Sequence, residues 1–146
     1  MTAGWTTRLL EGLAGHLAAA GVGTWRATGI YSAGETGILI RAVPPSPDRV
    51  VTLAAYPVAS PPGLTDHTTG VQIRVRAGSN PTECDDLADD IHDLLNGAHD
   101  LALGGIRISQ ITRTSYASLG QDGNRRWERS ENYYIQASRP TAHNTD

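Results

Sequence analysis

The strongest constraint on the fold lies in residues 71–97, where a strand pattern passes directly into a helix pattern. Apolar and polar residues alternate over residues 71–76, which is typical of a strand with one buried and one wet face. Asn80 is a favourable N-cap, Pro81 suits the first helical position, and Gly97 can supply a left-handed stop. Between them, apolar side chains recur at helical spacing at Cys84, Leu87, Ala88, Ile91, Leu94 and Leu95. This stretch predicts a chain that combines helix and sheet.

The other patterns extend this unit to one domain. A first helix is expected over residues 6–20, and the last two strands should form an antiparallel hairpin with a bulge within residues 108–111. Further strands are expected over residues 37–43, 50–58, 106–114 and 125–139. We therefore predict an α/β (α+β) domain over residues 1–140, with a mixed, mainly antiparallel four- to five-stranded sheet and two or three helices packed on one face. The tail, residues 141–146, is expected to be disordered.

The charge balance narrows the possible functions. A net charge of −3 argues against a general nucleic-acid binder. The single cysteine, Cys84, excludes an internal disulfide framework and suits a reducing compartment. The chain shows neither a signal peptide nor an apolar stretch approaching the ~20 residues that cross a membrane, so we expect a protein that is cytoplasmic where it is made.

All twelve basic residues are arginine, which pairs bidentately with carboxylates at interfaces. If the strand alternation holds, four of them gather on the wet face of the sheet: Arg74, Arg76, Arg107 and Arg113. This face could meet water or a partner.

The second predicted helix carries a run of aspartates on one side, opposite its leucines. At 100° per residue, Asp85, Asp86, Asp89, Asp90 and Asp93 form one continuous acidic surface. Like charges three or four residues apart disfavour the helix by roughly 0.2–0.5 kcal/mol per pair, and no arginine lies on this helix to offset them. The run is either a solvated face, or a surface that repels DNA or meets arginines of a neighbouring subunit.

Residues 120–129 combine a glycine-rich turn with the residue types that interfaces favour. The candidate interface residues are Arg125, Arg126, Trp127 and Arg129. The alternative is an ordinary hairpin with Trp127 in the core and the arginines in water.

We find no pattern that predicts catalysis, a metal or a cofactor. Asp89 and His92 have an acid-x-x-His spacing, but di-metal helical bundles need that motif twice together with further glutamates. The sequence lacks a nucleophile elbow and a lysine-containing phosphate loop. Cys84 lies on the apolar side of its helix, where a buried, inert thiol is expected. We therefore expect a protein that is not an enzyme.

Several segments, in one order along the chain, carry a family resemblance. They are GVGTW (Gly21–Trp25), YSAGETGI (Tyr31–Ile38), SPDRVV (Ser46–Val51), LADDIHDLL (Leu87–Leu95) and LGQDGNRRWERSENYYI (Leu119–Ile135). With these segments the chain resembles the minor capsid or tail-terminator proteins of long-tailed, siphovirus-type actinobacterial phages. The resemblance runs from about Thr6 to Pro140, and the joint order of the segments carries it.

This resemblance implies a structural role in the virion. Tail terminators of this kind form a ring, usually of six subunits, on the head-proximal end of the tail tube, where they stop tube polymerisation and present a surface to the head connector. The implied partners are further copies of the chain, the tail tube protein and the head–tail connector proteins, with DNA only as passing cargo. A closed ring needs head-to-tail contacts, for which the arginine-rich loop and the acidic helix side are complementary candidates. The acidic side could instead line the lumen.

Two other readings stay open. The first is another neck component, such as a head-closure or minor capsid protein, because related small α/β rings stack in the same neck. The second is a small ligand-binding module, which a pocket with convergent polar groups would favour.

Overall fold

The structure is a computed structural model that describes residues 3–145. Its elements, in chain order, are α1 (Trp5–Ala19), β1 (Thr24–Trp25), β2 (Thr36–Ile40), β3 (Arg49–Ala59), β4 (Asp66–Arg76), α2 (Pro81–Leu95), β5 (His99–Leu103), β6 (Ile106–Gln121) and β7 (Trp127–Ser138).

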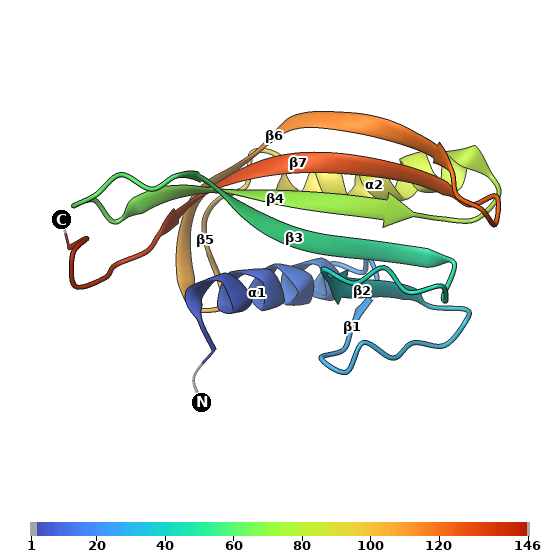
Figure 1. Ribbon diagram of the computed structural model, residues 1–146, viewed down its shortest axis with the longest axis horizontal. Coiled ribbons are helices and arrows are strands. Elements are labelled where there is room, and N and C mark those ends of the chain that lie inside the picture. The colour runs from blue at the N-terminus through green and yellow to red at the C-terminus, as the bar shows by residue number, and fades with distance from the viewer. Residues whose placement is uncertain (1–2, 146) are drawn as a thin grey trace.

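All the strands belong to one seven-stranded sheet in the order β1-β2-β3-β4-β7-β6-β5. The β1–β2 and β2–β3 pairs are parallel, and the other neighbours are antiparallel. Figure 1 shows that the sheet curls into a half-barrel whose hollow side carries both helices. α1 contacts β1, β2 and β3 as well as β5 and β6, so it spans the opening of the curl.

The sequence-based prediction of four to five strands was wrong, because the protein is mostly β with seven strands in its sheet. β1 and β5 were missed because they have only two and five residues, too few for an alternating pattern to stand out. β4 begins at Asp66 rather than Val71, and β6 continues to Gln121 through residues expected to form a loop.

One apolar cluster joins the helices to the hollow face of the sheet. α1 contributes Leu9, Leu13 and Leu17, all fully buried. β4 and β7 contribute the alternate residues that the pattern selected, including Ile73 and Tyr133. Aliphatic side chains fill most of this core because the chain contains no phenylalanine.

The ends of α2 confirm the sequence signals. The Asn80 side chain accepts a hydrogen bond from the Thr82 amide at 3.1 Å, and Pro81 opens the helix. Asn96 is the C-cap, and Gly97 follows with a φ of 87°, a conformation that glycine adopts without steric penalty. The antiparallel pairing of β6 with β7 and the shift in its register between Ile108 and Gln110 were also predicted.

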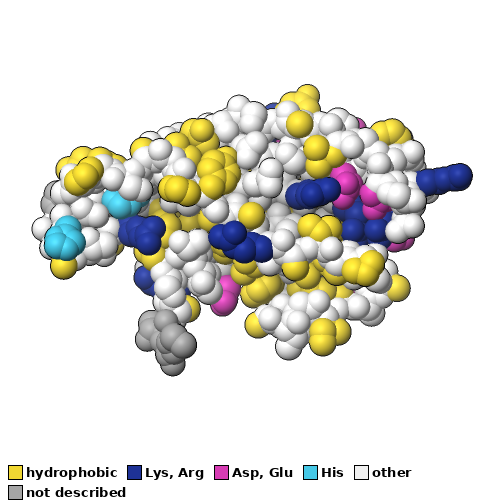
Figure 2. Space-filling model, in the orientation of Figure 1, with side chains coloured by type: hydrophobic (Ala, Val, Ile, Leu, Met, Phe, Trp, Pro, Cys, Tyr) yellow, Lys and Arg dark blue, Asp and Glu magenta, His cyan; other side chains and the backbone are white. Residues whose placement is uncertain are grey.

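Two of the four arginines predicted on the wet face of the sheet do not lie on a wet face. Arg113 is paired with Tyr133 on the helix-bearing face, where its guanidinium lies 3.1 Å from the buried Glu131 carboxylate, because the register shift in β6 changes which residues face the core. Arg76 was expected on a wet face, but its exposed fraction is only 3% because residues 41–48 fold over it. Figure 2 shows basic side chains spread over the viewed face, some among uncharged side chains and some, at the right, beside acidic ones. Within residues 3–145, neither helix is long and apolar enough to cross a membrane.

Candidate assembly surfaces

Arg76 fixes the proline-rich loop, residues 41–48, to the face of the sheet opposite the helices. Its guanidinium donates to three backbone oxygens of the loop, those of Pro44 at 2.7 Å, Pro47 at 2.7 Å and Asp48 at 3.0 Å. Burial, followed by the nearby charge of Arg126, lowers the pKa of Arg76. The loop carbonyls therefore replace water around a charge that the sheet alone would leave exposed.

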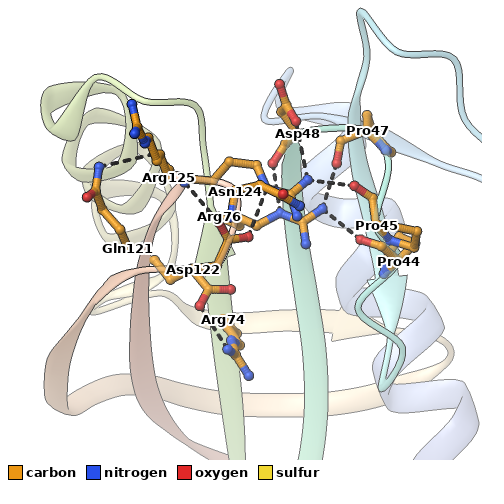
Figure 3. A network of polar contacts seen from close by, with 12 residues as sticks. Pro44, Pro45, Pro47, Asp48, Arg74, Arg76, Gln121, Asp122, Asn124 and Arg125 are labelled. Atoms are coloured by element: carbon orange, nitrogen blue, oxygen red, sulfur yellow. Dashed lines mark hydrogen bonds and ion pairs between the residues drawn. The ribbon is translucent and has the colours of Figure 1, made fainter.

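Arg126 holds the same loop from the β6–β7 turn. Figure 3 shows other members of this network, among them Pro45, Asp48 and Asp122, close together between the loop and the turn. Its guanidinium donates to the Pro45 oxygen and lies 3.2 Å from the Asp48 carboxylate. The Arg126 Nε donates to Asp122 at 2.8 Å, and the Arg126 amide also donates to Asp122. These bonds, led by the backbone bond from Arg126, lower the pKa of Asp122. Arg126 is 7% exposed, so little of it remains for a partner.

A second charged cluster lies between α2 and the strands β6 and β7. Glu131 is fully buried, and its carboxylate lies 2.9 Å from the Arg129 guanidinium and 3.1 Å from that of Arg113. Arg129 also contacts Asp85 of α2 at 3.1 Å. The Tyr116 ring stacks on both cations, at 4.4 Å from Arg129 and 5.1 Å from Arg113. Arg129 is thereby surrounded by groups of its own chain.

The carboxylates outweigh desolvation in this cluster. Burial alone would lower the pKa of Arg129, but Glu131 and Asp85 raise it overall, so the guanidinium is held firmly in its charged form. The same burial, followed by the charge of Glu131, raises the pKa of Tyr133.

The aspartates of α2 divide into two groups. Asp85 and Asp89 reach Arg129, at 3.1 and 3.9 Å, so an arginine from β7 offsets part of the repulsion along the helix. Asp86, Asp90 and Asp93 are exposed on the rest of the acidic side. Asp93 lies 3.0 Å from His92 on the same helix. Three carboxylates of the predicted surface thus contact no arginine within residues 3–145.

Of the four predicted interface residues, Arg125 alone is exposed. It stands in the β6–β7 turn with a φ of 62°, and its guanidinium has no ion-pair partner within residues 3–145. Trp127 is half-buried, packs against the core and donates from Nε1 to the Ser79 oxygen at 3.1 Å. The structure therefore separates Arg125 from Arg126, Trp127 and Arg129, which make contacts inside the chain.

Sequence reasoning missed Glu131, the buried carboxylate that pairs with both Arg129 and Arg113. The sequence did contain a signal for this pair, because Arg129 and Glu131 lie four and two residues before Tyr133 and so share its inward-facing side of β7. Charged residues at core positions need an opposite charge, so this parity alone predicts a buried ion pair. No group of three or more His, Cys, Asp or Glu side chains within the described part of the chain is arranged to hold a metal ion.

Comparisons with known proteins place these surfaces in context. Residues 16–139 match the sequence model of a family described as bacteriophage tail terminator protein. The fold is similar to a chain of the solved structure described as "Virion of native gene transfer agent (GTA) particle", with a TM-score of 0.62 and 17% sequence identity. That likeness covers 94% of this chain and 99% of the other, and at such identity it shows a shared fold. The comparison with curated proteins gives no match.

Proposed function

Because this chain belongs to the bacteriophage tail terminator family, we propose that it forms a ring of about six subunits at the head-proximal end of the tail tube. There it stops tube polymerisation and provides the surface to which the head connector binds. The observation that carries this proposal is the family match over residues 16–139, nearly the whole chain. The role is structural, and the protein belongs to the virion.

The shared fold with a chain of a gene transfer agent virion supports the same setting. A single domain built on a curled sheet can repeat around an axis while one end faces the tube and the other faces the head. The partners we propose are further copies of the chain, the tail tube protein and the head–tail connector proteins, with DNA passing through the ring.

The contact between neighbouring subunits in this ring would use the exposed charges that form no arginine–carboxylate pair within the described residues. Arg126 and Arg129 are bound within the chain, so Arg125 is the arginine of this group that can reach a neighbour. Its counterpart would be the exposed carboxylates of α2, Asp86, Asp90 and Asp93. Such a contact is head-to-tail, as a closed ring requires. If those carboxylates instead face the lumen, they would keep passing DNA from adhering.

The role is tested by disrupting this gene in the phage and imaging the tails that form. Loss of a terminator is expected to give tails of uncontrolled length that carry no heads, and expression of the wild-type chain in trans should restore uniform length. Tails of uniform, normal length without attached heads would instead identify another neck component.

A further inference from the structure

One half of β6 has a strand on one side only. β5 pairs with β6 between Ile106 and Gln110, and Ile111 then bonds through both its amide and its carbonyl oxygen to residues 97–98. From Thr114 to Leu119, β7 is the only strand of the described chain that lies beside β6. An unpaired strand edge is a template for another strand.

The ladder of β7 shows which main-chain groups face that edge. Trp127 bonds through its amide and its oxygen to Gly78 and Ala77, toward β4. Residues two apart face the same way, so Arg129 and Glu131 also bond toward β4. On β6, Ser118 is paired with Arg129, and Tyr116 is paired with Glu131. Ser118 and Tyr116 therefore face away from β7, and their N–H and C=O groups point to the open edge.

The other open edges of the sheet are obstructed. β1 has only two residues. On β3, Leu53 accepts a hydrogen bond from Arg41 on the β2 side, so Pro57, four residues on, faces the same edge without an N–H. β5 is short and is interrupted by Asp100 with a φ of 51°. By contrast, Thr114–Leu119 contains no proline and no charge.

We propose that the free protein pairs with a second copy of itself by joining the two β6 edges antiparallel about a two-fold axis at Ala117. In this register Tyr116 stands opposite Ser118 of the partner subunit, and Ser118 opposite the partner subunit's Tyr116. Each of these outward-facing pairs can exchange two N–H···O bonds, so four bonds form around the axis. Ala117 then meets the partner subunit's Ala117 as a non-hydrogen-bonded pair.

The side chains fit this register. On the helix-bearing face the large Tyr116 ring, 58% exposed, lies beside the small Ser118 of the partner subunit. On the opposite face two alanines meet where antiparallel strands approach most closely, at about 4.5 Å between Cα atoms. A self-complementary contact of this kind closes as a dimer.

The charges beside the edge also permit it. The acidic side of α2 nearest β6 presents Asp85 and Asp89, but Arg129 binds both. With the Arg113–Glu131 pair included, three carboxylates face two guanidiniums, so each copy brings little net charge to the contact. The contact buries few residues, so we expect a weak dimer whose population rises with concentration.

This pairing does not depend on the terminator role, since it covers an association-prone edge of the free chain before any ring forms. The first test compares Ser118→Pro with Ser118→Ala by sedimentation velocity across a concentration series. Proline removes the N–H that faces the partner and leaves the β7 ladder intact, so two of the four bonds disappear. We expect dimerisation to weaken at least about tenfold in Ser118→Pro and to change little in Ser118→Ala.

A second test stands even if Ser118→Pro folds poorly. Two cysteines at position 117 would meet within the roughly 4.4–6.8 Å that a disulfide spans, so Ala117→Cys should form a cross-linked dimer under mild oxidation. Thr112→Cys, also exposed on β6 but far from the axis, is the matched control and should remain monomeric. Cys84 is buried and does not compete.

A wild-type chain that stays monomeric at all concentrations overturns the proposal, as does equal cross-linking at positions 112 and 117. Dimers that persist with unchanged affinity in a folded Ser118→Pro variant would overturn the β6 pairing and leave the terminator role intact. If the chain forms normal dimers but disruption of its gene leaves tail length unchanged, the terminator role is overturned and the β6 pairing stands.

Discussion

The guanidinium of Arg129 on β7 lies 3.1 Å from the carboxylate of Asp85 on α2, within one chain. The same side chain lies 2.9 Å from Glu131, which is fully buried. The charges of Arg129 and of the acidic helix suggested that they form the two sides of a contact between subunits. The structure instead joins them in part within one subunit. The pair fixes the first turns of α2 over the sheet next to the open edge of β6.

Replacement of Arg129 by methionine should destabilise the protein strongly. Glu131 would keep only Arg113, and a buried carboxylate that loses a partner costs about 2–4 kcal/mol of the free energy of unfolding. Urea unfolding followed by circular dichroism measures the loss. Asp85→Asn is the matched control: the Asp85 side chain is 66% exposed, so its removal should cost less than about 1 kcal/mol. Equal losses in the two variants would contradict a central role for Glu131.

Replacement of Arg76 by methionine should release residues 41–48. Three backbone oxygens would lose their donor, and lysine cannot restore the fork that reaches all three. We expect a loss of about 2–3 kcal/mol in unfolding free energy. Hydrogen exchange should also accelerate at the loop amides, which are those of residues 41–43, 46 and 48, since its prolines have none. Arg107→Met, an exposed arginine elsewhere, should leave this exchange unchanged.

Glu35 should make the loop between β1 and β2 sensitive to acid. The Arg26 side chain, followed by the Ser32 backbone amide, holds the pKa of Glu35 at about 2, below its ordinary value of 4.5. A carboxylate with a lowered pKa stabilises the fold above the unfolded-state pKa, and that contribution is lost as the pH falls from about 4.5 toward 2.

The corresponding measurement is the urea midpoint of unfolding at pH 6 and pH 3. Glu35→Gln should show a smaller drop between these values than the wild type, whereas Glu11→Gln, an exposed carboxylate on α1, should behave as the wild type does. An unchanged drop in Glu35→Gln would mean that the bidentate Arg26 contact contributes nothing to acid stability.

Whether an element could be predicted from the sequence depends on the length of its pattern. The stretch with alternating Val71, Ile73 and Val75 followed by the capped helix was readable, because each signal there is local. β1 and β5 were not, since two and five residues acquire strand structure only from their neighbours in the sheet. The number of strands was therefore underestimated.

The candidate surface shows the same limit at the level of side chains. Arg125 and Arg126 are adjacent and identical in type, yet Arg125 is exposed and Arg126 is buried, with only 7% of it exposed. The difference arises from Pro45 and Asp48, roughly eighty residues earlier in the chain, which no local pattern connects to Arg126. The alternation of residues along β7 could have identified Arg129 and Glu131 as inward-facing. The burial of Arg126 under the loop could be seen only in the tertiary structure.

Charge reversal at Arg125 separates fold from assembly. Its side chain is exposed and has no ion-pair partner within the described residues, so Arg125→Glu should change the unfolding free energy by less than about 0.5 kcal/mol. If its guanidinium meets the α2 carboxylates of a neighbour, the same variant should fail to cap tail tubes, and Asp90→Arg introduced on α2 should partly restore capping. Arg107→Glu is the control for net charge. Tail lengths from complementation of the disrupted gene provide the measurement, and normal lengths with Arg125→Glu would leave the acidic side of α2 facing the lumen.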